Sequence, residues 1–335
     1  MALNKLETFE PTSRRFAFLG FEGCSYAPGR FGHSMVAYRD QLVVYGGQTG
    51  RSTLVPKSQC LKDLLSYSIP DGRWTLRPQN KQQSYARRNH SAFLLNRFLV
   101  IFGGINDFGR SMNDTLVYDL EQDRWVCDVP VEGAVPPLSH CGGRACFYPQ
   151  RHTEPLSRVS DLPAIDWGQS SQLIREEGFY LVGGVDAEGV ASGEVFVLRC
   201  EGLAMKWIKI SKRIKGSPPE PRHSLALTYF ERENALVVVG GRNDRKKIVY
   251  SDVFLLTLDT LIWVNVKCQG NGCIGRADHH IVQDSEWDFI IFGGLDANYR
   301  LSNKMSFLTF DRQKVASLAP SNAVQTSSVL SRKSR

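Results

Sequence analysis

Cysteine and histidine are the residue types in this sequence whose spacing first suggests chemistry. Cys141 and Cys146 have four residues between them and follow a histidine, and Cys268 and Cys273 repeat that spacing. Thiolates and imidazoles at short spacing are ligands of zinc. However, the cysteines of "HCGGRAC" alternate with strand residues, and no matching second half lies nearby in the sequence. We therefore interpret the cysteines as small hydrophobic residues, and we predict no metal site and no cofactor.

Five histidines recur in similar surroundings along the chain: His33, His90, His140, His223 and His279. Recurrence at equivalent places indicates repeat symmetry rather than one catalytic site. The sequence also lacks a Gly-x-Ser-x-Gly elbow, a phosphate loop with Gly-Lys-Ser/Thr and a His-Glu-x-x-His motif. We therefore predict a protein that is not an enzyme.

The composition is that of an ordinary globular protein. The chain has 335 residues, of which 42% are hydrophobic and 22% charged, with a formal net charge of +7. The N-terminal stretch has no apolar signal region, and no run is long enough to cross a membrane. The eight cysteines are scattered, which fits a reducing compartment. We expect a cytoplasmic protein, with a nuclear location as the alternative.

An internal repeat provides the elements that position these residues. Two glycines follow an apolar run five times, a second short strand follows each doublet, and a tryptophan follows in four of the five units. The second glycines of consecutive doublets are 57, 80, 57 and 53 residues apart. A period near 50 with four predicted strands is typical of propeller blades. The doublets are Gly46-Gly47, Gly103-Gly104, Gly183-Gly184, Gly240-Gly241 and Gly293-Gly294.

From about Arg30 to about Asp311 these units resemble the repeats of kelch-type β-propellers. The resemblance implies an all-β fold with five blades, each a four-stranded antiparallel sheet. We expect Phe16 to Phe18 to supply the strand that closes the ring; a sixth, degenerate blade assembled from the two chain ends is the alternative. We place the propeller at 1–318, with an insertion loop at 149–177 in blade three, and a disordered, basic, Ser-rich tail at 319–335.

We assign the glycine doublets and the tryptophans to architecture. Glycine lets the chain turn out of the second strand with a positive φ and leaves room for a neighbouring side chain. Tryptophan on the fourth strand and tyrosine on the third are expected to fill the space between blades.

The two faces of the predicted propeller differ in charge. We place the loops after the doublets and the links between blades on one face, which then carries about 20 basic and about 8 acidic residues, against about 8 and about 13 on the other. Arg30, Arg88, Arg222 and Arg276 recur once per blade, so we expect them to bind backbone carbonyls. The predicted partner-binding residues are Arg51, Arg87, Arg88, Arg110, Arg245, Lys246, Tyr299 and Arg300.

We predict a monomeric, non-catalytic interaction module or adaptor that binds an acidic or phosphorylated segment of another protein on the basic face. The resemblance implies this mode, and arginine suits recognition of carboxylates and phosphates. A nucleic-acid partner is disfavoured, because Tyr85 and Tyr299 are the exposed aromatics expected there and single strands need stacking platforms. The alternative is a propeller enzyme that acts on a small sugar-like substrate at the channel mouth, through dispersed Arg, Glu and His residues.

Overall fold

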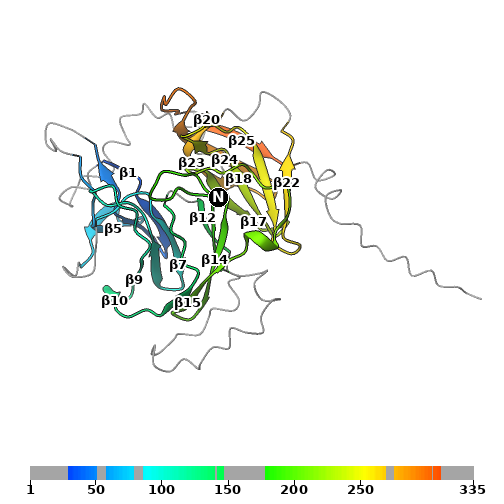
Figure 1. Ribbon diagram of the computed structural model, residues 1–335. Coiled ribbons are helices and arrows are strands. Elements are labelled where there is room, and N and C mark those ends of the chain that lie inside the picture. The colour runs from blue at the N-terminus through cyan, green and yellow to red at the C-terminus, as the bar shows by residue number, and fades with distance from the viewer. Residues whose placement is uncertain are drawn as a thin grey trace, which may run out of the picture.

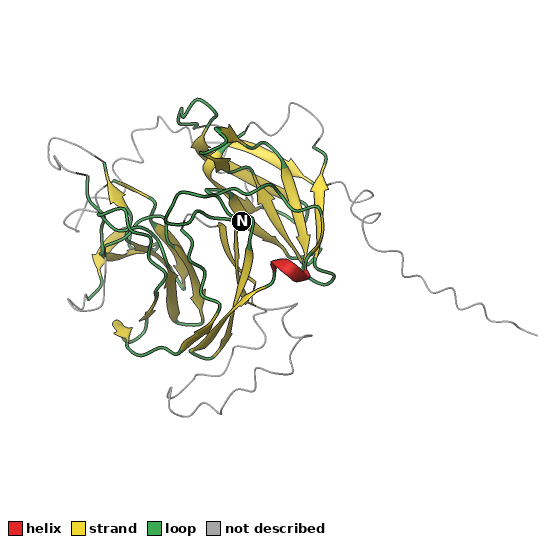
Figure 2. Cartoon of the chain, in the orientation of Figure 1, coloured by secondary structure: helices red, strands yellow, loops and turns green. Residues whose placement is uncertain are grey.

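The apolar runs that precede the glycine doublets form the second strand of five separate antiparallel sheets. In the part of the chain that the structure describes, one helical turn, Ser211–Arg213, accompanies the strands (Figure 2). No helix in that part is long and apolar enough to span a membrane. The computed structural model describes residues 29–50, 58–78, 86–139, 142–146 (backbone only), 178–268, 275–303 and 305–310.

Each of these sheets is one blade. Blade one contains β2 (Ser34–Tyr38), β3 (Gln41–Tyr45), β5 (Leu64–Ser68) and β6 (Arg73–Leu76). Blade two contains β7 (Ser91–Leu95), β8 (Phe98–Phe102), β9 (Thr115–Asp119) and β10 (Arg124–Val126). Blade three contains β12 (Gly142–Cys146), β13 (Gly178–Val182), β14 (Val195–Glu201) and β15 (Ala204–Lys209). Blade four contains β17 (Ala226–Phe230), β18 (Ala235–Val239), β21 (Val253–Thr257) and β22 (Ile262–Val266), and blade five contains β23 (Ala277–Gln283), β24 (Asp288–Leu295) and β25 (Met305–Thr309).

The first strands of consecutive blades lie side by side. β2 contacts β7, β7 contacts β12, β12 contacts β17, and β17 contacts β23. Figure 1 shows the sheets in this order, from blade one in blue to blade five in orange. The protein is a five-bladed β-propeller, as predicted.

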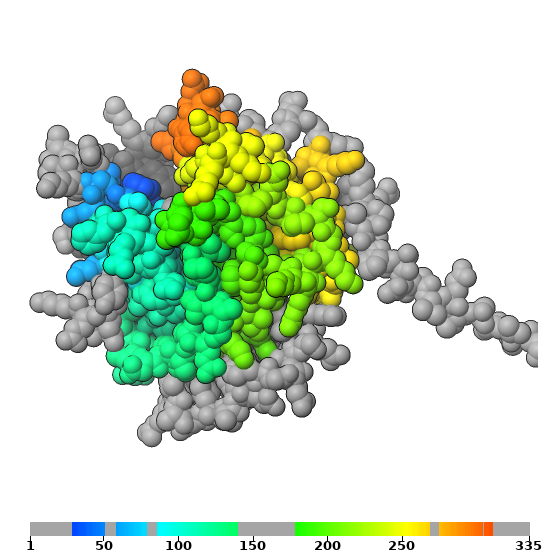
Figure 3. Space-filling model, viewed as in Figure 1, coloured from blue at the N-terminus to red at the C-terminus, as the bar shows by residue number. Residues whose placement is uncertain are grey.

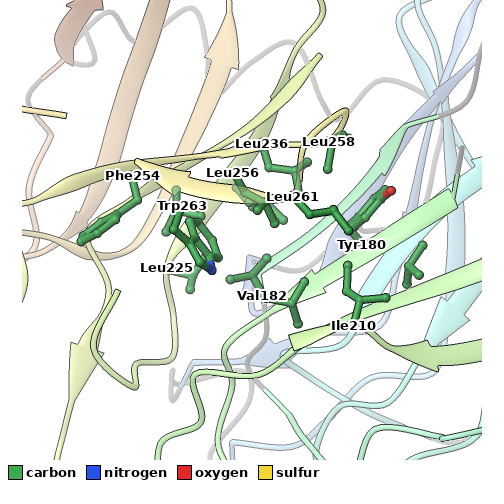
Figure 4. Close-up of a cluster of buried hydrophobic side chains, with 14 residues drawn as sticks. Tyr180, Val182, Ile210, Leu225, Leu236, Phe254, Leu256, Leu258, Leu261 and Trp263 are labelled. Carbon is green, nitrogen blue, oxygen red and sulfur yellow. The ribbon is translucent and has the colours of Figure 1, made fainter. Parts of the chain in front are cut away.

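The core lies between the blades. Between blades three and four, Tyr180, Val182 and Ile210 face Leu236 and Trp263 in one apolar cluster (Figure 4). All residues of β8, β13 and β18 are buried, because each second strand is covered by a neighbouring blade on both faces. Complete burial of one such side chain contributes about 1.5–3 kcal/mol, so each blade is stabilised mainly by its neighbours.

Trp125, Trp207 and Trp263 fill these interfaces as predicted, whereas Trp74 packs on Tyr67 of its own blade. Trp125 of blade two contacts Tyr45 of blade one with ring centroids 5.7 Å apart. Trp207 of blade three contacts Phe102 of blade two with centroids 4.6 Å apart. Both arrangements are tilted or edge-on, which is the preferred geometry of aromatic pairs.

Blades three and four each have a fifth strand at the outer edge, formed by the chain that enters the blade. β11 (Val131–Gly133) runs parallel to β15, and β16 (Lys215–Gly216) runs parallel to β22. The Lys215 amide donates to the carbonyl of Leu261, in the turn between β21 and β22, at 2.8 Å. That turn lies at the end of the blade opposite the glycine doublet. The prediction that all links between blades lie on the doublet face is therefore wrong, and Lys215 does not contribute to the charge of that face.

Blade five buries one of its faces in the described structure. Phe289, Ile291 and Leu308 pack against blade four, whereas Phe292 and Phe307 on the other face are 46% and 68% exposed. A sheet face of this composition is suited to packing against another element.

The predicted closing strand at Phe16 to Phe18 and both chain ends lie outside the described residues, as do the predicted insertion at 149–177 and tail at 319–335.

Candidate partner-binding face

Backbone hydrogen bonds join the glycine doublet of one blade to the entry of the next. The amide of the second glycine donates to an arginine carbonyl of the following blade, at 2.8 Å from Gly47 to Arg87 and at 2.8 Å from Gly241 to Arg276. One residue further on, the chain pairs with the loop after the doublet, as in the bridge between Arg88 and Ile105. The entry residues and the doublet loops therefore share one face of the propeller, called the doublet face below.

Four arginines bind the glycine doublets that form this face. Arg30, Arg87, Arg222 and Arg276 donate through Nη1 to the carbonyl of the first doublet glycine in their own blade, at distances of 3.0, 2.8, 3.1 and 3.4 Å. Arg87 also binds both carboxylate oxygens of Asp114 at 2.8 Å. Such charge-assisted, two-point contacts are among the strongest hydrogen bonds in proteins. These four side chains are structural.

The prediction for Arg87 is corrected by this geometry. Arg87 is completely buried, so it is not a partner-binding residue, and it is Arg87 rather than Arg88 that recurs once per blade. Arg88 is half-buried and donates to the side chain of Gln48 of blade one. The sequence contains a signal for the correct register, because "RFGH", "RRNH" and "RADH" all place the structural arginine three residues before a histidine.

The histidines are also less uniform than predicted. His90 and His279 lie against the second glycine of their own doublets, where Leu225 takes the same place in blade four. His223 is two residues earlier and faces Asp244 instead, with Nε2 3.3 Å from Oδ2. His140 lies outside the described residues. The repeat position therefore requires bulk rather than an imidazole.

Burial keeps these two histidines neutral. Desolvation, with help from Arg87 and Arg276 respectively, lowers the pKa of His90 to about 3 and the pKa of His279 to about 4. In the described structure neither ring nitrogen of His279 has a hydrogen-bond partner. A buried group of this kind is costly, because it has lost its hydration without replacement.

We expect His279→Leu to make the stability of the protein less sensitive to acid. The unfolded chain takes up a proton below the usual pKa of 6.5, while folded His279 stays neutral down to about pH 4. Stability therefore falls as the pH drops through this window, by about 3 kcal/mol for this residue. Urea unfolding at several pH values measures the slope. Exposed His280→Leu is the control, and an equally steep decline in His279→Leu would contradict this account.

Three doublet loops share one rigid turn. The side-chain oxygens of Asn106, Asp186 and Asp296 each accept two backbone hydrogen bonds from their own loop, at 2.7–3.0 Å. In blades two and three the fourth turn residue is Gly109 or Gly189, both with φ of 73°. In blade five the same position is Tyr299, with φ of 59°. The turn tips are thus held by their own backbones.

Most of the predicted partner-binding residues that the structure describes lie on the loops that follow the doublets of blades two, four and five. Arg110 and Arg300 are exposed, and neither guanidinium makes a hydrogen bond within the described structure. Arg245 donates to the Glu188 carbonyl of blade three at 2.7 Å, and Lys246 pairs with Glu220 at 2.8 Å. Arg110 and Arg300 occupy equivalent turn positions of blades two and five. Arg51 and Tyr85 lie outside the described residues.

Several carboxylates of the doublet face already accept hydrogen bonds from other groups of the protein. Asp186 and Asp296 hold their own turns, and backbone hydrogen bonds from Arg300 and Asn298 lower the pKa of Asp296. Asp107 accepts a 2.6 Å hydrogen bond from the amide of Cys60. Hydrogen bonds from Lys246 and Tyr250 lower the pKa of Glu220. Among the side chains of these loops, the charges that face solvent without a partner are therefore mainly basic.

Exposed apolar side chains accompany these basic groups; Tyr299 was predicted from the sequence, whereas Phe31, Phe108 and Leu301 were missed. Phe108 and Leu301 are 89% and 88% exposed, and Phe31 and Tyr299 are 53% and 60% exposed. The repeat could have revealed Phe108 and Leu301, because both follow a doublet, where the strand pattern has already ended, whereas Phe31 lies in the short strand β1 (Arg30–Phe31). The doublet face is both basic and apolar.

One row of side chains on this face has the residue types of a hydrolytic triad. His223 Nδ1 lies 3.2 Å from the Ser224 hydroxyl, and its Nε2 lies 3.3 Å from Asp244. However, Ser224 is only 7% exposed, and Asp244 also pairs with Arg242. A nucleophile has to reach its substrate, so this row does not serve as a catalytic site.

The cysteines, the potential metal ligands and the pocket of the described structure give little support for a chemical site. The described residues contain no group of three or more potential metal ligands, while Cys141 and Cys273 of the two spaced pairs lie outside them. Cys60 is buried, and burial raises the pKa of Cys200 to about 12, whereas Cys127 and Cys268 are exposed. An open pocket of about 700 Å³ lies near Arg232 and Glu286, between the opposite-face turns of blades four and five.

Comparison with known proteins agrees with the fold. A family model described as the KLHDC2/KLHL20/DRC7 Kelch-repeats domain matches residues 2–153 and 168–329. A solved structure titled "Structure of YjhT" superposes with a TM-score of 0.59 at 14% identity, over 84% of this chain and 82% of that chain. At that identity the likeness shows a shared fold.

Curated relatives match over part of their own length. The dynein alpha chain of the flagellar outer arm of Chlamydomonas reinhardtii is 30% identical over 70% of this chain and 5% of its own length. Acyl-CoA-binding domain-containing protein 5 of Arabidopsis thaliana is 26% identical over 66% of this chain and 30% of its own. An F-box/kelch-repeat protein of the same plant is 27% identical over 71% of this chain and 44% of its own. The chain thus spans less than half the length of these relatives.

Proposed function

This chain belongs to the kelch-repeat family, and we propose that it is a non-catalytic interaction module whose doublet face binds an acidic or phosphorylated segment of another protein. The proposed contact residues are Arg88, Arg110, Arg245, Lys246, Tyr299 and Arg300, while Arg87 is removed from the predicted set.

This proposal rests on a difference between the acidic and the basic side chains of the doublet face. Several of its carboxylates already have partners within the protein, whereas two of its arginines have none in the described structure. Arg110 and Arg300 stand at equivalent positions of turns that are already rigid, and their guanidinium groups meet no acceptor in the described structure. Because the turn backbone is already ordered, binding has to order only the arginine side chains. A guanidinium binds a carboxylate or phosphate through two parallel hydrogen bonds. Two or more such groups on one face favour a segment with several negative charges.

The relatives support a role in binding other proteins. One relative is an F-box/kelch-repeat protein, and the dynein alpha chain, which matches this chain over 5% of its own length, belongs to the flagellar outer arm. Because a fold alone does not fix a function, the proposal rests on the side chains of the doublet face. We assign no reaction step to the described residues.

Charge reversal at the two free arginines tests the proposal. We expect Arg110→Glu/Arg300→Glu to bind a fluorescein-labelled phosphoserine-glutamate peptide at least about tenfold more weakly than the wild type, measured by fluorescence anisotropy. Binding to the wild type should also weaken as salt is added, because exposed charges are screened.

The matched control is Arg73→Glu/Arg124→Glu. Both arginines are exposed at the start of β6 and β10, on the opposite face, so the net charge changes equally. This variant should bind almost as the wild type does. Equal weakening in the two variants would mean that overall charge, rather than the doublet face, attracts the peptide, and it would refute the proposed site.

A further inference from the structure

Blade five departs from its sister blades at two neighbouring surface positions. Where blades two and three have Gly109 and Gly189, blade five has Tyr299 in the same left-handed conformation. Where those blades have Ser111 and Ala191 in the bridge that closes the turn, blade five has Leu301 in the bridge with Leu295. The turn forms equally well with the small residues, so its backbone does not require either large side chain.

Neither Tyr299 nor Leu301 is of the residue type that would favour folding at its position. Glycine adopts a positive φ without steric cost, whereas a bulky residue is strained there. Leu301 is 88% exposed and Tyr299 is 60% exposed, so little of either side chain is removed from water within the chain. Strained backbone and exposed apolar surface that the fold does not need occur most often at binding sites.

The neighbouring hairpin of blade four completes a small patch. β19 (Arg242–Asn243) and β20 (Ile248–Val249) form this hairpin, and Figure 3 shows it in yellow beside the orange turn of blade five. The Tyr299 hydroxyl donates to Asp244 at 3.5 Å, and the Arg242 guanidinium carbon lies 5.8 Å from the centre of the Tyr299 ring. These weak contacts place the ring beside the hairpin, while 60% of Tyr299 remains exposed. Arg300 lies between Tyr299 and Leu301 in the sequence, and Lys247 directly precedes Ile248; both basic residues are exposed.

We infer that Tyr299, Leu301 and Ile248 form an anchor site for one large apolar side chain of the partner, flanked in the partner's sequence by acidic residues. This inference rests on the proposed function, because the flanking acids would bind Arg300 and Lys247. Aromatic residues and arginines at the centre of an interface carry most of its binding energy. The ligand class is therefore a short acidic segment with an aliphatic or aromatic residue at its centre, rather than a uniformly charged one.

Two synthetic peptides separate the anchor from the charge. The first alternates glutamate and serine, and the second is identical except for a central leucine. Wild-type protein should bind the leucine peptide about tenfold more tightly, which is the gain expected when one such side chain leaves water. Tyr299→Gly/Leu301→Ser, which restores residues of the sister blades, should bind both peptides as the wild type binds the serine peptide.

The variant is chosen so that loss of folding does not explain its behaviour. Because glycine relieves the strained φ, it should melt at or above the temperature of the wild type. If the wild type binds both peptides equally, or the variant keeps the preference for leucine, the anchor is refuted while the proposed function stands. If neither peptide binds the wild type, the proposed function fails as well. A dimer seen by light scattering that the variant abolishes would identify a second copy as the occupant and refute the inference.

Discussion

Arg87→Ala is expected to lower the free energy of unfolding by about 3–5 kcal/mol, whereas Arg88→Ala should lower it by less than about 1 kcal/mol. The Arg87 side chain is completely buried and binds the Gly103 carbonyl and both oxygens of Asp114 at 2.8 Å. Its removal leaves a cavity, an unpaired carbonyl and a carboxylate without its counter-charge. Arg88 has a side-chain contact to Gln48 and remains half in water.

Urea unfolding of the two variants measures this difference directly. The residues are adjacent and identical in type, so unfolded-state effects are nearly the same in both. Blade three has Leu138 at the place of the structural arginine, since its carbonyl faces Gly103 as the Arg87 carbonyl faces Gly46. Arg87→Leu should therefore recover part of the loss by filling space. Equal destabilisation by Arg87→Ala and Arg88→Ala would show that the side chains do not have the roles described.

Gly240→Ala is expected to destabilise the protein by at least about 3 kcal/mol, against about 1 kcal/mol for Gly109→Ala. Both glycines have a positive φ, of 58° and 73°. A methyl group at Gly240 would lie 2.4 Å from the Arg276 carbonyl oxygen and 3.0 Å from the His279 ring, whereas at Gly109 it would meet nothing within 4 Å. Gly109→Ala thus measures the cost of the backbone conformation alone.

The excess at Gly240 measures how closely two blades approach each other. The Arg276 carbonyl belongs to blade five and accepts the amide of Gly241, so it cannot move away without breaking an inter-blade hydrogen bond. Thermal and urea unfolding of both variants should rank them in this order. If the two substitutions cost the same, the doublet would be required for its φ values only, and the role of close blade contact would be wrong.

The sequence by itself determined the architecture, because repetition carries that information. Five Gly-Gly doublets, three of whose four intervals are 53–57 residues, predict five blades, and the tryptophans predict what fills the space between them. Trp125 and Trp207 indeed lie between neighbouring blades. Such a prediction depends on local turn and strand preferences, and the same preferences recur in every repeat unit. A misinterpretation of one unit is therefore revealed by comparison with the other units.

The function of single side chains was decided by the tertiary structure. Arg87 and Arg88 have identical side chains. The histidine three residues after Arg87 marks it as the repeating one, but it is the path of the chain into blade two that buries Arg87 and leaves Arg88 half-exposed. The path of Lys215 across the opposite face depends in the same way on a parallel strand pair. Tyr299 was already in the predicted set, whereas Leu301 became a candidate only when the turns of blades two, three and five were aligned by their hydrogen bonds and bridges. Whether a charged or apolar side chain is buried, paired or open to a partner depends on neighbours from distant parts of the chain, which a local pattern does not encode.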